Sequence, residues 1–287
     1  MTAGMDGDEY AGMEAAYRLI DRLGAGEFSG RVIVVPVVNA PGFAAECSQN
    51  PLDGLLPKMR GLGRPNGSPT DRLLSWLSTY IRQAECGYDM HGGALTEGLQ
   101  PFLWLHRVPG EADALHAQIV ESRLAETIVD ERAMRISKAE VLAREGRAYI
   151  LAESGARGER RPEDIERHLR WVHGVMALMG MVDGGVTPVA EARVFHRVKY
   201  YVAPFDGIWR AADARKDIRK GEAVGTCTRL DGTGAAVIRF RQNGIRLWWK
   251  ETMALRKGDV VCAVAYNETK DPRNARLWEP FVAGEVA

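Results

Sequence analysis

The chain has 287 residues, of which 46% are hydrophobic and 26% are charged, a composition typical of a folded globular protein. Its 38 basic and 38 acidic residues cancel, so no net charge draws it to nucleic acid or to an anionic membrane, and no apolar run approaches the roughly 20 residues of a membrane span. The four cysteines are scattered without a CxxC pair and the N-terminus has no signal-peptide pattern, so we expect a cytoplasmic protein with reduced thiols.

The first part of the chain contains both helical and strand patterns. Apolar residues recur at helical spacing over residues 8–24, and the β-branched run over residues 31–38 is typical of a central strand covered on both faces. Residues 39–67 form a long segment rich in Gly, Pro and Asn, and such segments are usually functional. Ser68 is a good N-cap for a helix that runs to residue 81.

The same alternation continues beyond residue 81. The patterns predict a strand that ends at His91, strands over residues 101–107 and 147–152, and helices near residues 111–125, 138–144 and 161–181. Strands that alternate with helices predict an α/β domain over residues 1–183, with a mixed, mostly parallel sheet and helices on both faces.

The pattern changes in the last third of the chain, where short β-type segments alternate with glycine turns. Residues 206–208 match residues 243–245, and residues 219–222 match residues 256–259, both at an offset of 37 positions. Two related halves of this kind predict a small β-sandwich or barrel over residues 184–287.

One stretch of the α/β part has the character of a ligand site. Asp89 and His91 are two positions apart, so in a strand their side chains point to the same side. The glycine pair at residues 92–93 lets the backbone turn and leaves room beside the imidazole. Open α/β sheets bind ligands at the carboxyl ends of their strands. A half-buried strand that ends in a polar turn explains this stretch equally well.

Acidic residues stand at two further element ends. Asp6 and Glu9 are three apart, so one helical turn brings both carboxylates to one side, where with a distant histidine they could hold a zinc ion. Acidic residues at a helix start also suit the helix dipole, which on spacing alone is the favoured explanation. Glu153 follows a strand and could accept a proton from a water molecule at a metal site, although a solvated strand end is more frequent for a single glutamate.

Taken in order, these segments resemble the succinylglutamate desuccinylase/aspartoacylase family, which shares its fold with zinc carboxypeptidases. Residues 4–12 are similar to the first zinc motif of that family, residues 89–93 to the second, and residues 152–155 to the segment that bears the catalytic glutamate. The approach to the substrate loop and the helix after it are matched by residues 36–43, 50–54 and 67–73.

The resemblance implies a metal-dependent hydrolase that cleaves the N-acyl amide bond of a small acylated amino acid or amine. By position, the divalent metal would be held by Asp6, Glu9 and His91, with Glu153 as general base. Asn39 and Asp53 would belong to the substrate-binding loop. The partner is then a small-molecule substrate, and homo-oligomers are compatible with the family.

Three departures from the family pattern point to an alternative. Asp6 stands where the family has histidine, so zinc is the first expectation but manganese or ferrous iron also suits two carboxylates. Lys58 and Met59 stand where the family has an Asn-Arg pair that grips the substrate carboxylate, and Arg60 or Arg64 would have to replace it. Of the expected first strand, only residues 2–4 are present. The alternative is a family member that is diverted to another reaction or is inactive and acts in binding.

Overall fold

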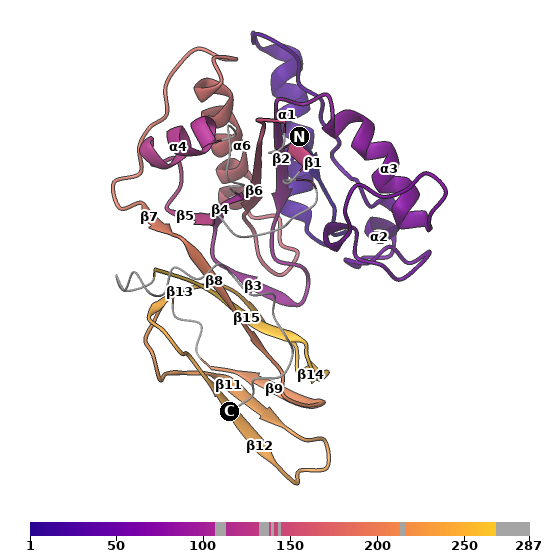
Figure 1. Ribbon diagram of the computed structural model, residues 1–287, viewed down its shortest axis with the longest axis vertical. Coiled ribbons are helices and arrows are strands. Elements are labelled where there is room, and N and C mark those ends of the chain that lie inside the picture. Colours follow the sequence, from indigo (N-terminus) through magenta and orange to yellow (C-terminus); the bar gives the residue numbers. More distant parts are fainter. Residues whose placement is uncertain (107–112, 132–137, 139–140, 143–144, 213–215, 268–287) are drawn as a thin grey trace.

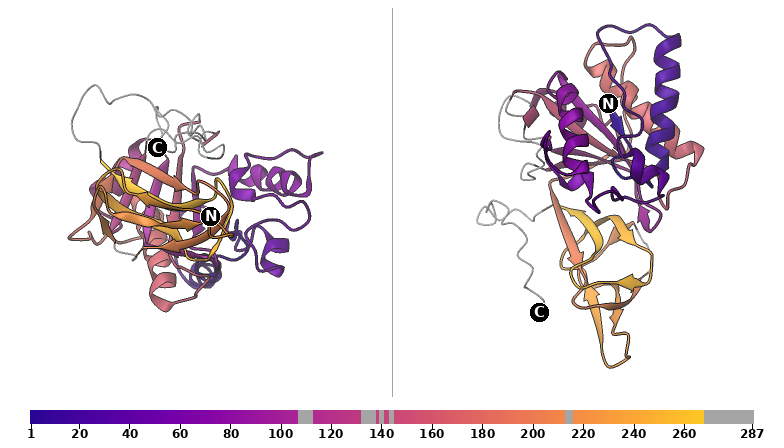
Figure 2. Two further views of the ribbon diagram at one scale, coloured as in Figure 1. Left: turned by 90° about the horizontal axis from the view of Figure 1, so that it is seen from below. Right: turned by 90° about the vertical axis from the view of Figure 1, so that its right-hand side faces the viewer.

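The computed structural model describes residues 1–106, 113–131, 138, 141–142, 145–212 and 216–267. It contains an α/β region with a six-stranded sheet and a β region with antiparallel sheets of five and four strands. Figure 1 shows the α/β region above the β region, and the right-hand view of Figure 2 shows the same two parts from the side.

The six-stranded sheet is mixed and mostly parallel, as predicted. Among its neighbouring strands only β4 and β6 run antiparallel. The carboxyl ends of the adjacent parallel strands β2 and β6 bring His91 and Glu153 opposite each other. In spatial order the strands are β1 (Thr2–Ala3), β2 (Cys86–His91), β6 (Ala148–Glu153), β4 (Phe102–His106), β5 (Thr127–Glu131) and β7 (Arg193–Phe195).

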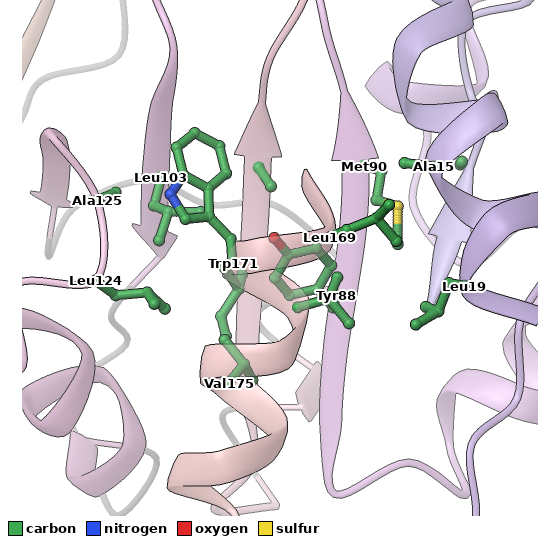
Figure 3. Packing of buried hydrophobic residues seen from close by; sticks show 14 of the residues in the cluster. Ala15, Leu19, Tyr88, Met90, Leu103, Leu124, Ala125, Leu169, Trp171 and Val175 are labelled. Carbon is green, nitrogen blue, oxygen red and sulfur yellow. The ribbon is translucent and has the colours of Figure 1, made fainter. Parts of the chain in front are cut away.

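Three amphipathic helices pack on one face of this sheet. They are α1 (Tyr10–Ala25), α4 (Asp113–Glu121) and α6 (Pro162–Leu178), which confirms the helices expected near residues 8–24, 111–125 and 161–181. Their apolar stripes meet Tyr88 and Met90 of β2 in the main core, where Figure 3 shows Leu169 and Trp171 of α6. The alternation of β2 therefore leaves Asp89 and His91 on the opposite face.

That opposite face is covered in two ways. Tyr149 and Leu151 of β6 pack against Leu142 and against Ile81 of α3 (Pro69–Ile81). The Ser68 hydroxyl accepts a hydrogen bond from the Asp71 amide at 3.2 Å, which confirms the predicted N-cap of α3. Of the helix expected near residues 138–144, residues 138, 141 and 142 are helical and the others lie outside the described residues. Towards β4 and β5 this face meets the β region instead of a helix.

Residues 31–38 are not the central strand that their β-branched composition predicts. They run beside the two-residue strand β1 at the sheet edge, where Val35 forms a single bridge to Thr2. The Ala3 amide donates to the Val35 carbonyl and the Val35 amide to the Met1 carbonyl, both at 3.0 Å. A strand as short as β1 cannot support a longer ladder. The segment is apolar because its side chains still pack on both sides, Val34 against the main core and Val35 against α3.

In the β region the repeat is visible in the strands themselves. β9 (Gly207–Ala211), β10 (Asp217–Ile218) and β11 (Ala223–Thr228) are followed 37 positions later by β13 (Gly244–Lys250), β14 (Ala254–Leu255) and β15 (Val260–Tyr266). The short strand of each half pairs with a strand of the other half: β10 pairs with β13, and β14 pairs with β9. The remaining strands are β3 (Glu97–Leu99), β8 (Arg197–Val202) and β12 (Ala235–Arg239). The two antiparallel sheets share one apolar core; their finer classification as a sandwich or barrel stays a prediction.

Strands cross between the two regions in both directions. β3, from the first half of the chain, pairs with β13, and β7, which follows residue 184, pairs with β5 of the six-stranded sheet. Phe102 and Trp104 of β4 pack against Ile245 and Leu247 of β13. Residue 184 stays a predicted boundary, and the contacts across it are extensive.

Two expectations from composition can be compared with the structure. All four cysteines are free thiols, two of them buried. Within the described part of the chain, every helix is too short or too polar to cross a bilayer.

Candidate metal centre

Three side chains that could bind a metal meet at the carboxyl end of β2. Asp6 lies in the turn after β1, Glu9 directly precedes α1, and His91 ends β2. One ligand atom from each lies within 4.8 Å of the others. The three residues are 0%, 3% and 3% exposed, so two carboxylates and an imidazole face one another in a buried site. The structure therefore brings the three sequence-predicted ligands together.

The turn that carries Asp6 depends on glycine. Gly4 has a φ of 65°, a left-handed conformation that glycine adopts without strain. At Gly7 a Cβ atom would overlap the carbonyl carbon of Gly42 and the backbone nitrogen of Phe43. The chain beside Asp6 therefore packs closely against α2 (Ala40–Ala44). Asp8 points elsewhere, as expected, and accepts a hydrogen bond from Ser48 Oγ at 2.7 Å.

Glu9 is held by the site and not by the helix it precedes. It is the N-cap residue of α1 but makes no capping hydrogen bond with its side chain. Its Oε2 atom instead accepts a hydrogen bond from the Gly92 amide at 3.1 Å and lies 3.0 Å from His91 Nδ1. The helix-dipole explanation, favoured on spacing alone, therefore does not account for where this carboxylate points.

His91 uses its two ring nitrogens on different sides. Nδ1 faces Glu9 and lies 3.9 Å from Asp6 Oδ2, while Nε2 lies 3.3 Å from Asp89 Oδ2. The predicted placement of Asp89 and His91 on one side of the strand is thus confirmed. Burial opposes the charged imidazole, but Asp89 and Glu9 outweigh it and raise the pKa of His91 well above its ordinary value. A carboxylate behind a histidine in this way fixes the ring orientation for metal binding.

Asp89 has three further partners that the sequence did not reveal. It accepts hydrogen bonds from Thr2 Oγ1 at 2.6 Å and from Tyr149 Oη at 2.7 Å, and Lys138 Nζ lies 3.5 Å away. Burial alone would raise its pKa, but Lys138 and His91 hold the pKa of Asp89 well below its ordinary value. Asp89 is therefore an ionised carboxylate that supports His91 from behind.

Lys58 contacts the cluster, which the sequence reasoning did not predict. It lies on the 3-10 turn η1 (Pro57–Met59), and its ammonium group forms a short ion pair with Asp6 Oδ2 and lies 3.9 Å from Glu9 Oε1. Burial raises the pKa of Asp6 to about 7, and Lys58 limits that rise. Burial disfavours the charged amine, but Asp6 and Glu9 raise the pKa of Lys58 well above its ordinary value. The sequence contained one indication of this contact, because Lys58 stands where the family pattern has asparagine.

Glu153 lies beside the cluster, opposite His91 in the β2–β6 pairing. Its Oε2 atom is buried without a hydrogen-bond partner among the described residues. Burial raises its pKa well above the ordinary value; His91 and Lys58 oppose this rise and Glu9 adds to it. Tyr200 of β8 interacts electrostatically with this carboxylate. Burial, Glu131 and Glu153 raise the pKa of the Tyr200 phenol. The β region therefore contributes to the surroundings of the site.

The four predicted substrate residues make structural contacts. Arg60 and Arg64 each lie 3.3 Å from the carboxylate of Asp71, and no ion pair or hydrogen bond among the described residues joins them to the cluster. Asn39 caps α2 by accepting from the Gly42 amide at 3.1 Å. Asp53 accepts from the Thr70 amide and hydroxyl, both at 2.8 Å. Their role in substrate binding stays a prediction.

Comparison with known proteins identifies the relatives of this chain. The family described as succinylglutamate desuccinylase/aspartoacylase catalytic domain matches residues 1–179. The chain is 23% identical over 286 residues to the N-alpha-acetyl-L-2,4-diaminobutyric acid deacetylase of Halomonas elongata, covering 92% of this chain and 81% of that protein.

Two solved structures share the fold over nearly the whole chain. The succinylglutamate desuccinylase/aspartoacylase from Rhodobacter sphaeroides has a TM-score of 0.79 at 24% identity, covering 93% of this chain and 85% of its own. The product-bound ectoine utilization protein EutE (DoeB) from Ruegeria pomeroyi has a TM-score of 0.81 at 23% identity, covering 92% and 84%. Since the family match also spans more than half of the sequence, this chain belongs to the succinylglutamate desuccinylase/aspartoacylase family.

Proposed function

We propose that the protein hydrolyses the amide bond of a small N-acylated amino acid or amine, with one divalent metal ion held by Asp6, Glu9 and His91. The observation that carries this proposal is the buried convergence of these three ligand atoms within 4.8 Å of one another. Family membership and the named deacetylase relative support acyl-amide hydrolysis as the reaction class.

The donor set suits a divalent cation. Asp6 Oδ1 is buried without a hydrogen-bond partner among the described residues, and Glu9 and His91 present their own donor atoms to the same space. Two carboxylates and an imidazole bind zinc, and also manganese or ferrous iron. When bound there, such an ion would polarise the acyl carbonyl and make a water molecule more acidic.

Glu153 has the position of the proton-transfer residue. Its Oε2 atom has no hydrogen-bond partner among the described residues and lies beside the cluster, where a carboxylate can take a proton from a water molecule and later return it. In the reaction, the water oxygen attacks the acyl carbon and Glu153 accepts the water proton. The carbon–nitrogen bond then breaks, and Glu153 passes the proton to the leaving amine nitrogen. The products are a carboxylic acid and an amine.

The test combines metal content with amine release. The purified protein is loaded with zinc, its metal content is measured by mass spectrometry, and amine release is followed for a panel of N-acetylated amino acids. The panel includes N-acetylated diamino acids, because the Halomonas elongata relative is named for one.

The matched variant is Glu153→Gln, which keeps the size of the side chain and removes the base. We expect one zinc per chain in both proteins and a rate about 10²–10⁴-fold lower in the variant. Less than about a tenth of a zinc per chain in the wild-type protein would contradict the metal site. Equal rates in the two proteins would remove Glu153 from the mechanism.

The ion pair between Lys58 and Asp6 favours a second candidate, a family member that has lost or changed its reaction. In that case amine release would be absent from the whole panel even when the protein is fully loaded with metal. The presence of zinc without hydrolysis would therefore select this alternative.

A further inference from the structure

The cluster of Asp6, Glu9 and His91 already contains a cation from the chain itself. Asp6 and Glu9 are almost fully buried, and two buried carboxylates require positive charge close by. Beside His91, which faces Glu9, Lys58 supplies it, because its ammonium group contacts Asp6 Oδ2 and lies 3.9 Å from Glu9 Oε1. Buried like charges would otherwise repel each other, so Lys58 stabilises the site as it stands.

The ammonium group contacts one of the two Asp6 oxygens through which a metal ion could bind. Asp6 Oδ2 is the oxygen that faces His91 Nδ1, at 3.9 Å, and it is also the oxygen that Lys58 contacts. A divalent cation bound to that oxygen would stand within a few ångströms of the ammonium group, in a site from which water is largely excluded. Two cations at such a distance repel each other strongly, so both cannot occupy the site.

The position of Lys58 also allows its ammonium group to move away from Asp6 into solvent. Its side chain is 35% exposed, unlike Asp6 and Glu9, and it projects from a single 3-10 turn. The next residue, Met59, is 75% exposed, so the turn is not packed on its outer side. A lysine has a flexible four-carbon stem and a strongly hydrated head, and it can turn to solvent without unfolding its surroundings.

We propose that Lys58 is the counter-cation of the metal-free site and that its ammonium group must withdraw from Asp6 before a divalent ion binds. This inference rests on the proposed metal site and adds to it a determinant of metal affinity. In the metal-loaded protein the carboxylates of Asp6 and Glu9 are neutralised by the metal, and Lys58 extends into solvent.

The first experiment measures zinc affinity by competition with a chromophoric chelator, starting from metal-free protein. Lys58→Met keeps the length of the side chain and removes its charge, whereas Lys58→Arg keeps the charge. Arg72→Met removes an exposed positive charge from α3 and controls for long-range electrostatics. We expect zinc affinity about 10–100-fold higher in Lys58→Met than in the wild type, and little change in the other two variants.

Thermal unfolding gives a second result on the same proteins. Without metal, Lys58→Met should unfold at a lower temperature than the wild type, because the buried carboxylate of Asp6 loses the ammonium group that contacts it. Saturating zinc should then raise its unfolding temperature by more than that of the wild type, as tighter binding requires.

A third measurement needs no variant. An amine-acylating reagent is applied to the wild-type protein with and without zinc, and the modified fraction at Lys58 is read by peptide mass spectrometry relative to the exposed Lys220. Zinc should raise the modification of Lys58 and leave that of Lys220 unchanged.

The outcomes separate this inference from the proposed function. Stoichiometric zinc in the wild type, with equal affinity in Lys58→Met and unchanged modification of Lys58, overturns the role of Lys58 and leaves the metal site standing. If neither protein binds zinc at millimolar concentration, the metal site and the inference fall together.

Discussion

Glu131 should make the stability of this protein fall as the pH rises through neutrality. The residue ends β5 and is 4% exposed. Trp104 Nε1 donates a hydrogen bond to its Oε2 at 3.2 Å, and the Val198 amide of β8 also donates to the carboxyl group. Burial outweighs these donors and raises the pKa of Glu131 from 4.5 to about 7.

The sign and size of the effect follow from proton linkage. A raised carboxyl pKa means that the folded state holds the proton more tightly than the unfolded state does. The stabilisation is complete below the unfolded pKa of 4.5 and is lost as the pH rises to the folded pKa of about 7. Applied to these two values, the linkage relation predicts a loss of about 2.5 kcal/mol between pH 5 and pH 8.

The variant Glu131→Gln tests this directly because its side chain does not titrate. The side-chain amide of the variant has one oxygen where the carboxyl group has two. One of the two donors, Trp104 Nε1 or the Val198 amide, therefore loses its acceptor, which costs about 1 kcal/mol. We therefore expect the variant to be about 1 kcal/mol less stable than the wild type at pH 5 and about 1.5 kcal/mol more stable at pH 8. Urea unfolding followed by tryptophan fluorescence at each pH measures the difference.

Glu191→Gln, at an exposed position, is the control and should give the same difference at both pH values. The reasoning is refuted if the stability difference between Glu131→Gln and the wild type changes by less than about 0.5 kcal/mol between pH 5 and pH 8.

Two other changes test how the site is held together. Gly7→Ala should destabilise the protein by about 1–3 kcal/mol and weaken zinc binding, because the added methyl group overlaps the backbone of α2; Gly24→Ala, which meets open space in α1, should instead stabilise it by about 0.5–1 kcal/mol in the same thermal unfolding assay. Equal effects of the two glycine variants would contradict the steric argument. Asp89→Asn should weaken zinc binding about 10–100-fold, measured by chelator competition, because His91 loses the carboxylate behind it. It should also destabilise the metal-free protein by about 3–5 kcal/mol, since the buried Lys138 loses the carboxylate with which it pairs among the described residues, and adding Lys138→Met should recover stability but not zinc affinity. Unchanged zinc affinity in Asp89→Asn would show that His91 does not depend on it.

Local patterns in the sequence determined most of the secondary structure and the candidate ligands. The helices that became α1, α3 and α6 follow from apolar periodicity and from one N-cap, since these features act within a few residues. The 37-residue offset marked three pairs of equivalent strands. The motifs around Asp6 and His91 were recognisable because their spacing and most of their residue types resemble those of the family to which the chain belongs.

The tertiary structure alone decided the pairings between distant segments. The apolar run over residues 31–38 became an edge segment because its neighbour β1 has only two residues. β3 pairs with β13 of the β region, and β7 pairs with β5 of the six-stranded sheet. Lys58 lies 52 positions from Asp6, and no local pattern shows that its ammonium group reaches that carboxylate. Such contacts depend on where the whole chain brings each charge, because buried charges are stable only beside an opposite charge or a hydrogen-bond partner, whatever their separation in sequence.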